Sequence, residues 1–146
     1  MVKPIRVGLD SSELQSYVLV DGYRTAMREL KKCLGKELSK ELTAAIRESA
    51  ERIIIPAIQQ ETPVRTGRLR GSVKPGVRVS GMSIRAGTPK GIPYAGPIHF
   101  GWKKRNIQPN KFIYRGAQKS LPEFVEEVQG ILREYEKRCS KRINRR

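Results

Sequence analysis

Apolar residues recur at spacings of three and four over residues 23–60, and this stripe constrains the fold more than any other feature. Such spacing places the apolar side chains on one face of a helix, with charged residues on the other positions. Because the helix is long and its stripe narrow, we expect it to pack on a sheet on one side and to contact a second chain on the other. The stripe consists of Met27, Leu30, Leu34, Leu38, Leu42, Ile46, Ala50 and Ile54.

Three features predict where this helix bends and where it ends. Gly35 lies inside the pattern and is expected to bend or break the helix. Glycine in a helix interior is less stable than alanine by about 1 kcal/mol. Pro56 removes a backbone donor near the end of the pattern. Pro63 disfavours helical backbone at Thr62, which predicts that the helix stops there.

Residues 68–102 are predicted to form antiparallel sheet. If Ser80-Gly81 is a two-residue turn, apolar residues face apolar residues and polar residues face polar ones, as a strand register requires. The expected pairs are Val79 with Met82, Val77 with Ile84 and Arg78 with Ser83.

Residues 94–102 alternate in a way that predicts a further strand. Tyr94, Ile98, Phe100 and Trp102 then share one face. Pro97 suits an edge strand or a bulge. On this alternation His99 points away from the aromatic face, which makes it a surface or interface histidine.

The two ends of the chain are predicted from weaker patterns. Residues 1–22 are interpreted as an arm, in which the alternation of Ile5, Val7 and Leu9 predicts a short strand. Residues 17–20 form either a second short strand or the lead-in to the long helix. The end, residues 139–146, is interpreted as a frayed basic tail.

A last helical pattern covers residues 110–138. Ser120 and Glu123 resemble a capping box with Pro122 in the first turn, so this element is either one helix or a short helix followed by a long one. Its apolar stripe consists of Ala117, Leu121, Phe124, Val125, Val128, Ile131, Leu132 and Tyr135.

These elements predict an α+β fold in a single domain, residues 1–146. A long N-terminal helix and a C-terminal helix are expected to pack on a small antiparallel sheet of about three to five strands.

The charge is spread unevenly over a chain with a net charge of +16. Residues 1–62 hold 10 cations and 9 acids, residues 63–102 hold 7 cations and no acid, and residues 103–146 hold 13 cations and 5 acids. The acid-free stretch cannot balance its own charge and needs an anionic partner, a neighbouring subunit or water. Clustered positive charge favours phosphates, acidic protein surfaces or anionic membranes. This points to binding or assembly before catalysis.

Residues suited to catalysis are scarce. His99 is the only histidine, and the two aspartates, Asp10 and Asp21, both lie in the arm. The glutamates lie in or beside the helical segments, where they are usually solvated. Neither a nucleophile with a base nor a phosphate-binding loop is visible. We therefore expect no enzyme activity, no metal and no cofactor.

The cysteines and the apolar runs bear on the compartment. Cys33 and Cys139 are far apart in sequence and are interpreted as two reduced thiols of a cytosolic protein. The start of the chain lacks the apolar core of a signal peptide. The longest apolar run, residues 53–58, is too short to span a bilayer. The protein is thus expected on the cytosolic side, unless a partner carries it out.

Aromatic residues interleave with the cations from Tyr94 to Tyr114. They suit either a stacking platform for nucleic acid or a buried core, and the apolar strand face favours the core. Non-specific phosphate contact stays open, because charge alone can supply it.

Two segments resemble a family of neck and tail-completion proteins from long-tailed bacteriophages. Residues 62–73, Thr-Pro-Val-Arg-Thr-Gly-Arg-Leu-Arg-Gly-Ser-Val, are similar to the turn by which the family's long helix enters its sheet. Residues 94–102, Tyr-Ala-Gly-Pro-Ile-His-Phe-Gly-Trp, resemble its second pattern, followed by a Pro-x-x-Phe helix start at 109–112. The resemblance covers about residues 25–138, and Trp102 departs from the threonine of many relatives.

The resemblance implies a structural virion protein without catalysis or cofactor. Members form rings of identical subunits at the neck and join the DNA-filled head to the tail, or complete the head-proximal end of the tail. The implied partners are further copies of the chain, neighbouring head-completion and tail-terminator or tail-tube proteins, and packaged DNA through non-specific contact, with no membrane. The implied location is the virion neck, and the host cytoplasm during assembly. The alternative is a basic, non-specific nucleic-acid-binding protein.

The resemblance and the charge pattern together assign roles to three sets of residues. The turn motif consists of Pro63, Thr66, Gly67 and Leu69. Contacts to a neighbouring subunit or to DNA are expected from Arg65, Arg68, Arg70, Arg78, Arg85, Lys103, Lys104 and Arg105. The strand-end motif consists of Tyr94, His99, Phe100, Gly101 and Trp102.

Overall fold

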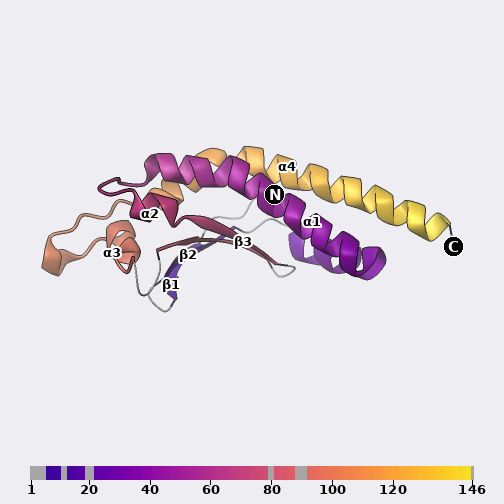
Figure 1. Ribbon diagram of the computed structural model, residues 1–146, viewed down its shortest axis with the longest axis horizontal. Coiled ribbons are helices and arrows are strands. Elements are labelled where there is room, and N and C mark those ends of the chain that lie inside the picture. The colour runs from indigo at the N-terminus through magenta and orange to yellow at the C-terminus, as the bar shows by residue number, and fades with distance from the viewer. Residues whose placement is uncertain (1–5, 11–12, 19–21, 79–80, 88–91, 146) are drawn as a thin grey trace.

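Two long antiparallel helices cross one face of a four-stranded antiparallel sheet (Figure 1). This computed structural model describes residues 6–10, 13–18, 22–78, 81–87 and 92–145, the first two ranges by their backbone alone. The α+β class and the two long helices expected from the sequence are confirmed. The elements are β1 (Arg6–Asp10), β2 (Glu13–Val18), α1 (Tyr23–Glu61), α2 (Arg68–Gly71), β3 (Lys74–Arg78), β4 (Gly81–Ala86), α3 (Ala95–Phe100), the 3₁₀ helix η1 (Lys103–Arg105) and α4 (Phe112–Asn144).

Helix α1 follows the predicted stripe closely. All eight stripe residues are buried except Leu38, which is half-buried against the core. The helix continues through Pro56 and ends at Thr62, whose backbone is extended (φ −75°, ψ 128°) as the following Pro63 requires. Gly35 breaks the helical backbone with φ 80° and ψ −177°, so the bend expected there is confirmed.

Helix α4 is one helix, which resolves the alternative left open by the sequence. The Ser120 hydroxyl donates to the carbonyl oxygen of Gly116 at 3.0 Å, so this serine lies within a helix and caps none. The prediction of a frayed basic tail from residue 139 is wrong, because α4 continues to Asn144. Cations are favourable at a helix C-terminus, and contacts of Cys139 and Arg142 with α1 hold this end.

The sheet has the strand order β1-β2-β4-β3, with every neighbouring pair antiparallel. Two strands come from the arm, so residues 6–18 belong to the sheet, and the choice left open at residues 17–20 falls to strand as far as Val18. Ile5, Leu19 and Val20 lie outside the described residues.

The predicted hairpin register is wrong by two residues. Val77 pairs with Met82, and Pro75 pairs with Ile84. Gly81 belongs to β4 instead of the turn, while Val79 and Ser80 lie outside the described residues. A shift by two keeps each side chain on its face of the sheet, which explains why the apolar pattern alone did not expose the error.

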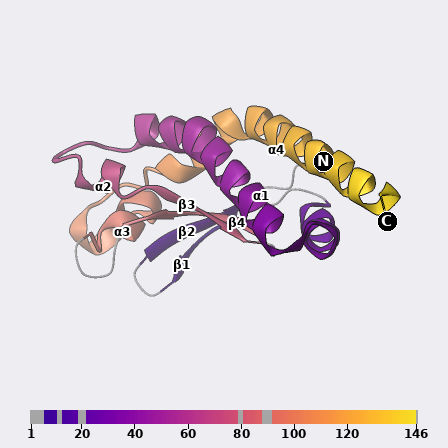
Figure 2. The ribbon, with the colours of Figure 1, turned by 45° about the vertical axis from the view of Figure 1, so that its right-hand side comes forward.

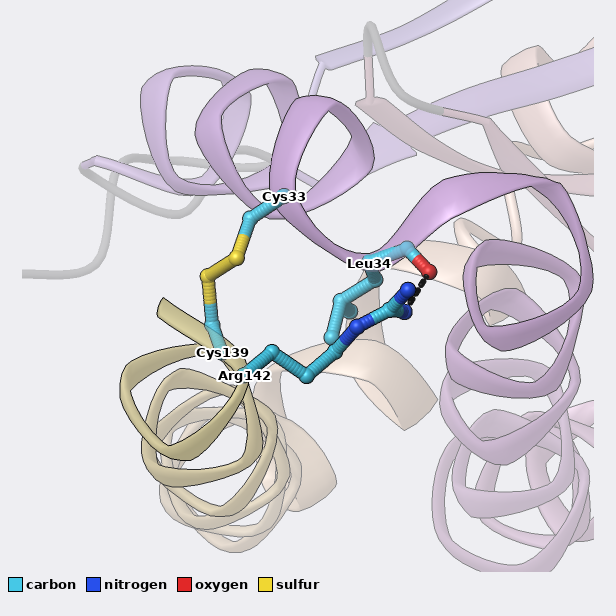
Figure 3. Close-up of a disulfide and its surroundings, with 4 residues drawn as sticks. All are labelled: Cys33, Leu34, Cys139 and Arg142. Atoms are coloured by element: carbon cyan, nitrogen blue, oxygen red, sulfur yellow. Dashed lines mark hydrogen bonds between the residues drawn. A yellow bond between two sulfur atoms is a disulfide. The ribbon is translucent and has the colours of Figure 1, made fainter. Parts of the chain in front are cut away.

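A disulfide joins Cys33 in α1 to Cys139 in α4, with the two Cα atoms 5.9 Å apart (Figure 3). The expectation of two reduced thiols is therefore wrong for this structure. Sequence spacing could not reveal the pair, because the two residues become neighbours only when the long helices pack antiparallel. This bond closes a segment of 106 residues.

The helices approach closely where Gly116 of α4 lies against α1. A Cβ at Gly116 would lie 2.5 Å from the Cα of Ile58 and 2.8 Å from the carbonyl oxygen of Ala57. These are backbone atoms, so they move only if the helices separate. Gly130, in the same helix, has nothing within 4 Å of its Cβ position.

We expect Gly116→Ala to lower the free energy of unfolding by about 1–3 kcal/mol, because it overpacks the helix contact. The matched control, Gly130→Ala, should raise it by about 0.4–1 kcal/mol, since alanine favours helix and meets open space. Urea denaturation of the oxidised proteins measures both changes. Equal effects of the two substitutions would contradict the close contact at Gly116.

Candidate functional site

The turn after α1 is shaped by backbone restrictions at two residues. Pro63 fixes the extended end of α1, and the Thr62 hydroxyl donates to the carbonyl oxygen of Ile58 at 2.7 Å. Gly67 has φ 81°, a conformation that side chains disfavour, and it directly precedes α2. The buried side chain of Leu69 then anchors α2 in the core. The turn motif therefore occupies the helix-to-sheet connection, as the sequence predicted.

Arg70 closes this turn back onto α1. Its Nε donates to the carbonyl oxygen of Gln59 at 2.8 Å, and Gln59 Nε2 donates to the carbonyl oxygen of Arg70 at 3.2 Å. The guanidinium predicted to contact a partner thus has a bond within the chain. Arg65, by contrast, is exposed beside the groove described below.

The strand predicted over residues 94–102 is wrong, because residues 95–100 form helix α3. Tyr94, Ile98 and Trp102 are four residues apart, a spacing that fits a helix as well as an alternating strand. Pro97 lies in the first turn of α3, where its missing N–H has no helical partner to lose. The alternation was therefore ambiguous, and the proline pointed to a helix start.

After α3 the chain turns at Gly101, where φ is 82°. A Cβ there would lie 2.9 Å from the Pro109 ring, so only glycine fits. Trp102 and Ile107 exchange backbone hydrogen bonds of 2.8 and 3.0 Å and close the loop that holds η1. The predicted strand-end motif therefore ends a helix instead of a strand, with Gly101 at the turn.

The two segments that carried the family resemblance meet at one groove of about 600 Å³, here called the turn groove. Figure 2 shows that α2 and α3 lie at the same end of the molecule. Three apolar side chains contributed by residues 94–107 lie opposite the turn after α1. The groove is lined by Pro63, Val64, Arg65, Thr66, Gly67, Arg68, Leu69, Tyr94, Ile98 and Ile107.

Large apolar side chains are exposed in and around this groove. Val64 is 57% exposed, Trp102 45%, Phe100 43% and Tyr94 36%. The Arg105 guanidinium lies 5.5 Å from the Trp102 ring centroid, within cation–π range. The expectation that these aromatics form the core is wrong, and only Phe112 of the group is fully buried. Lys103 and Lys104 are exposed in η1, next to Trp102.

A charged junction that sequence reasoning missed holds the two sides of the groove together. Arg115 of α4 donates to the Glu61 carboxylate at 3.1 Å and to the Asn110 side-chain oxygen at 2.9 Å. Lys119 donates to the same carboxylate. Hydrogen bonds from Lys119 and then Arg115 lower the pKa of Glu61. Glu61 is the last acid before the acid-free stretch. This position is the one sequence feature that could have indicated that Glu61 pairs with distant cations.

Two predicted contact cations, Arg78 and Arg85, lie away from the groove on the sheet, together with Lys74, which was not among the predicted contacts. Lys74, Arg78 and Arg85 are exposed and alternate with buried residues of β3 and β4, so they occupy the face opposite the long helices. Lys74 pairs directly with Arg85 in the register. Like charges in this position repel. Within the part of the chain that the structure describes, no carboxylate pairs with these three cations.

His99 is buried, so its prediction as a surface or interface histidine is wrong. Its ring makes edge contacts with Phe100 and Phe112, at centroid distances of 4.7 and 5.6 Å. Neither ring nitrogen has a hydrogen-bond partner among the described residues. Burial first, and then the nearby cations Lys111 and Arg115, lower the pKa of His99 from its usual 6.5 to about 4.

No group of three or more metal-ligating side chains forms among the described residues. No helix built by those residues has the length and apolarity needed to cross a membrane. Comparisons with protein-family models, curated protein sequences and solved structures found no match.

The neutral state of His99 predicts a pH-dependent stability. Between pH 6.5 and about 4 the unfolded chain binds a proton that the folded chain excludes, so stability falls as the pH falls through this window. We expect the loss to be about 2–3 kcal/mol. His99→Leu should remove this part of the slope. The difference between wild-type and variant urea midpoints from pH 7 to 4 isolates it from other groups, and parallel curves would contradict the assignment.

Proposed function

We propose that this chain is a non-enzymatic structural protein of a long-tailed bacteriophage, which forms or completes a ring at the head–tail junction. The observation that carries the proposal is the turn groove. Two segments about 30 residues apart, each resembling the neck family, line one surface feature. Segments that serve separate local turns have no need to share a groove, whereas a docking surface brings them together.

The chemistry of this end supports contact with proteins. Tryptophan, tyrosine and arginine dominate the energetics of protein interfaces, and Trp102, Tyr94 and Arg65 are all exposed here. A surface that carries exposed aromatics needs a partner to cover them. Identical subunits joined head-to-tail through such a surface close into a ring when the rotation permits. Neighbouring head-completion and tail proteins are the other proposed partners.

The proposal predicts a genetic result. Deleting the gene in its phage should yield DNA-filled heads and tails that remain separate, and supplying the chain in trans should restore joined virions. Trp102→Ala should reduce that rescue by at least about tenfold, because it removes an exposed anchor of the interface. Electron microscopy and plaque counts measure the outcome.

Tyr114→Ala is the matched control for Trp102→Ala. Tyr114 is also an exposed aromatic, but it lies on α4 and bonds Gln118 in the same helix. It should rescue like the wild type. Full rescue by the Trp102 variant would exclude this surface from assembly, and absence of the chain from purified virions would overturn the function itself.

A second candidate function, non-specific nucleic-acid binding, is favoured by the cations on the sheet. Lys74 and Arg85 are adjacent in the register and have no acidic partner among the described residues. Phosphates would relieve their mutual repulsion. A channel that releases DNA quickly is poorly served by tight phosphate contacts, and for this reason the assembly function ranks first.

A salt series separates the two functions. If the sheet face binds DNA, log Kobs should fall steeply with log salt, and replacing Lys74, Arg78 and Arg85 with glutamine should reduce the slope by up to about 2.7. Fluorescence anisotropy with a duplex oligonucleotide measures the slope. The control replaces Lys137 and Lys141 of α4, and Arg145 directly after it, with glutamine. An unchanged slope in the sheet variant would reject DNA contact through this face.

A further inference from the structure

The first part of α1, residues 23–34, is separated from the rest of the helix by the break at Gly35. A positive φ of 80° is open to glycine and disfavoured for other residues. Nothing lies within 4 Å of a Cβ placed there. Glycine is therefore favoured at this position by the backbone conformation and not by crowding. Gly35 is therefore the residue at which the helical backbone of α1 is interrupted.

The buried side chains of Tyr23, Met27, Leu30 and Leu34 anchor this first part in the core, and the Tyr23 hydroxyl donates to the carbonyl oxygen of Arg78 at 2.9 Å. Two contacts from α4 add to this anchoring next to the break (Figure 3). Cys33, two residues before the break, is bonded to Cys139. Arg142 donates to the carbonyl oxygen of Leu34. A helix break leaves such carbonyls without an intrahelical partner, and Arg142 supplies one. One tether is covalent and the other is a single hydrogen bond, so the disulfide is the stronger constraint.

The disulfide is accessible to small reagents. Cys33 and Cys139 are half-buried, and both line a surface cavity of about 390 Å³. Cys33, Lys32 and Arg142 line a second cavity of about 250 Å³. Glu29 lines both cavities and pairs with Lys32, so the charges around the disulfide are mixed. Access to small reagents is therefore what favours making and breaking this bond.

We propose that the Cys33–Cys139 disulfide is a reversible lock on the bend of α1. When it is closed, residues 23–34 are fixed against α4. When it is reduced, residues 23–34 keep their core contacts but open locally about Gly35 more often. This inference concerns the isolated chain and does not rest on the proposed function.

The lock closes by exchange with a low-molecular-weight disulfide. The Cys33 thiolate attacks one sulfur of the reagent and releases one reagent thiolate. The Cys139 thiolate then attacks the Cys33 sulfur and releases the second. Two cysteine thiols lose two electrons and two protons, and one reagent disulfide becomes two thiols. A small dithiol reverses the reaction.

The lock also controls a groove at the bend, of about 610 Å³. Its lining comes from both sides of Gly35, with Met27 before the break and Leu42 after it. Straightening α1 would move these residues apart along one continuous helix. We therefore expect the shape of the groove to depend on the bend. Its cations are Lys31, Lys36, Lys40 and Arg47.

Hydrogen exchange tests the lock on the full wild-type chain, oxidised or treated with dithiothreitol. Reduction should speed exchange of the amides in residues 24–34 at least about tenfold, while residues 42–58 should change by less than about twofold. Equal exchange in the two redox states, or a uniform change along α1, would overturn the proposal.

Three variants serve as controls. Cys33→Ser/Cys139→Ser should exchange like the reduced chain whether or not dithiothreitol is present. Under reducing conditions Arg142→Ala should loosen residues 24–34 further. Lys141→Ala removes a cation from the same turn of α4 and should not. If Lys141→Ala loosens the segment equally, general charge is responsible and the two-tether account fails.

Gly35→Ala supplies an independent readout. Alanine favours helical backbone at position 35 and is strained at the observed φ. In the reduced chain it should raise the helical signal at 222 nm. In the oxidised chain it should instead lower Tm, because the disulfide keeps the bend. The same response in both redox states would show that the disulfide does not hold the bend.

Discussion

The antiparallel contact between α1 and α4 is the constraint on which the rest of the structure depends. At one end Gly116 lets the helix backbones approach, and the Glu61–Arg115 ion pair bonds the two helices side by side. At the other end a disulfide joins them. The sheet packs on the face that this pair leaves open. Because the turn after α1 and the loop before α4 start from the same end of the pair, the turn groove forms there.

The sequence predicted the helices well, because a stripe of buried residues repeats over many turns and one error does not change it. It predicted short segments poorly, because few residues carry the signal. At Tyr94, Ile98 and Trp102 a spacing of four fits two kinds of structure, and the wrong one was chosen. The wrong prediction that His99 lies at the surface followed from the same error. The disulfide and the Arg115 junction depend on tertiary packing, which no local pattern encodes.

The acid-free stretch is explained in part by the fold. Its first cations divide between internal and exposed roles: Arg70 bonds the end of α1, whereas Arg65 is exposed beside the groove. On the sheet, Lys74 and Arg85 face each other across the strands. Acidic residues in this stretch would neutralise either positive surface. Their absence therefore preserves two separate positive surfaces, one at the turn groove and one on the sheet.

The two proposed sites lie at opposite ends of α1, and the packing between them decides whether they are coupled. From Leu42 to Ile58 the helix is buried against α4 and the sheet, and packed interiors do not deform continuously. Tyr23, Met27, Leu30 and Leu34 are buried as well, so local opening of residues 23–34 breaks core contacts at that end, and the packed segment from Leu42 to Ile58 separates it from the turn groove. We therefore expect oxidation to change the first part of α1 and to leave the proposed docking surface unchanged.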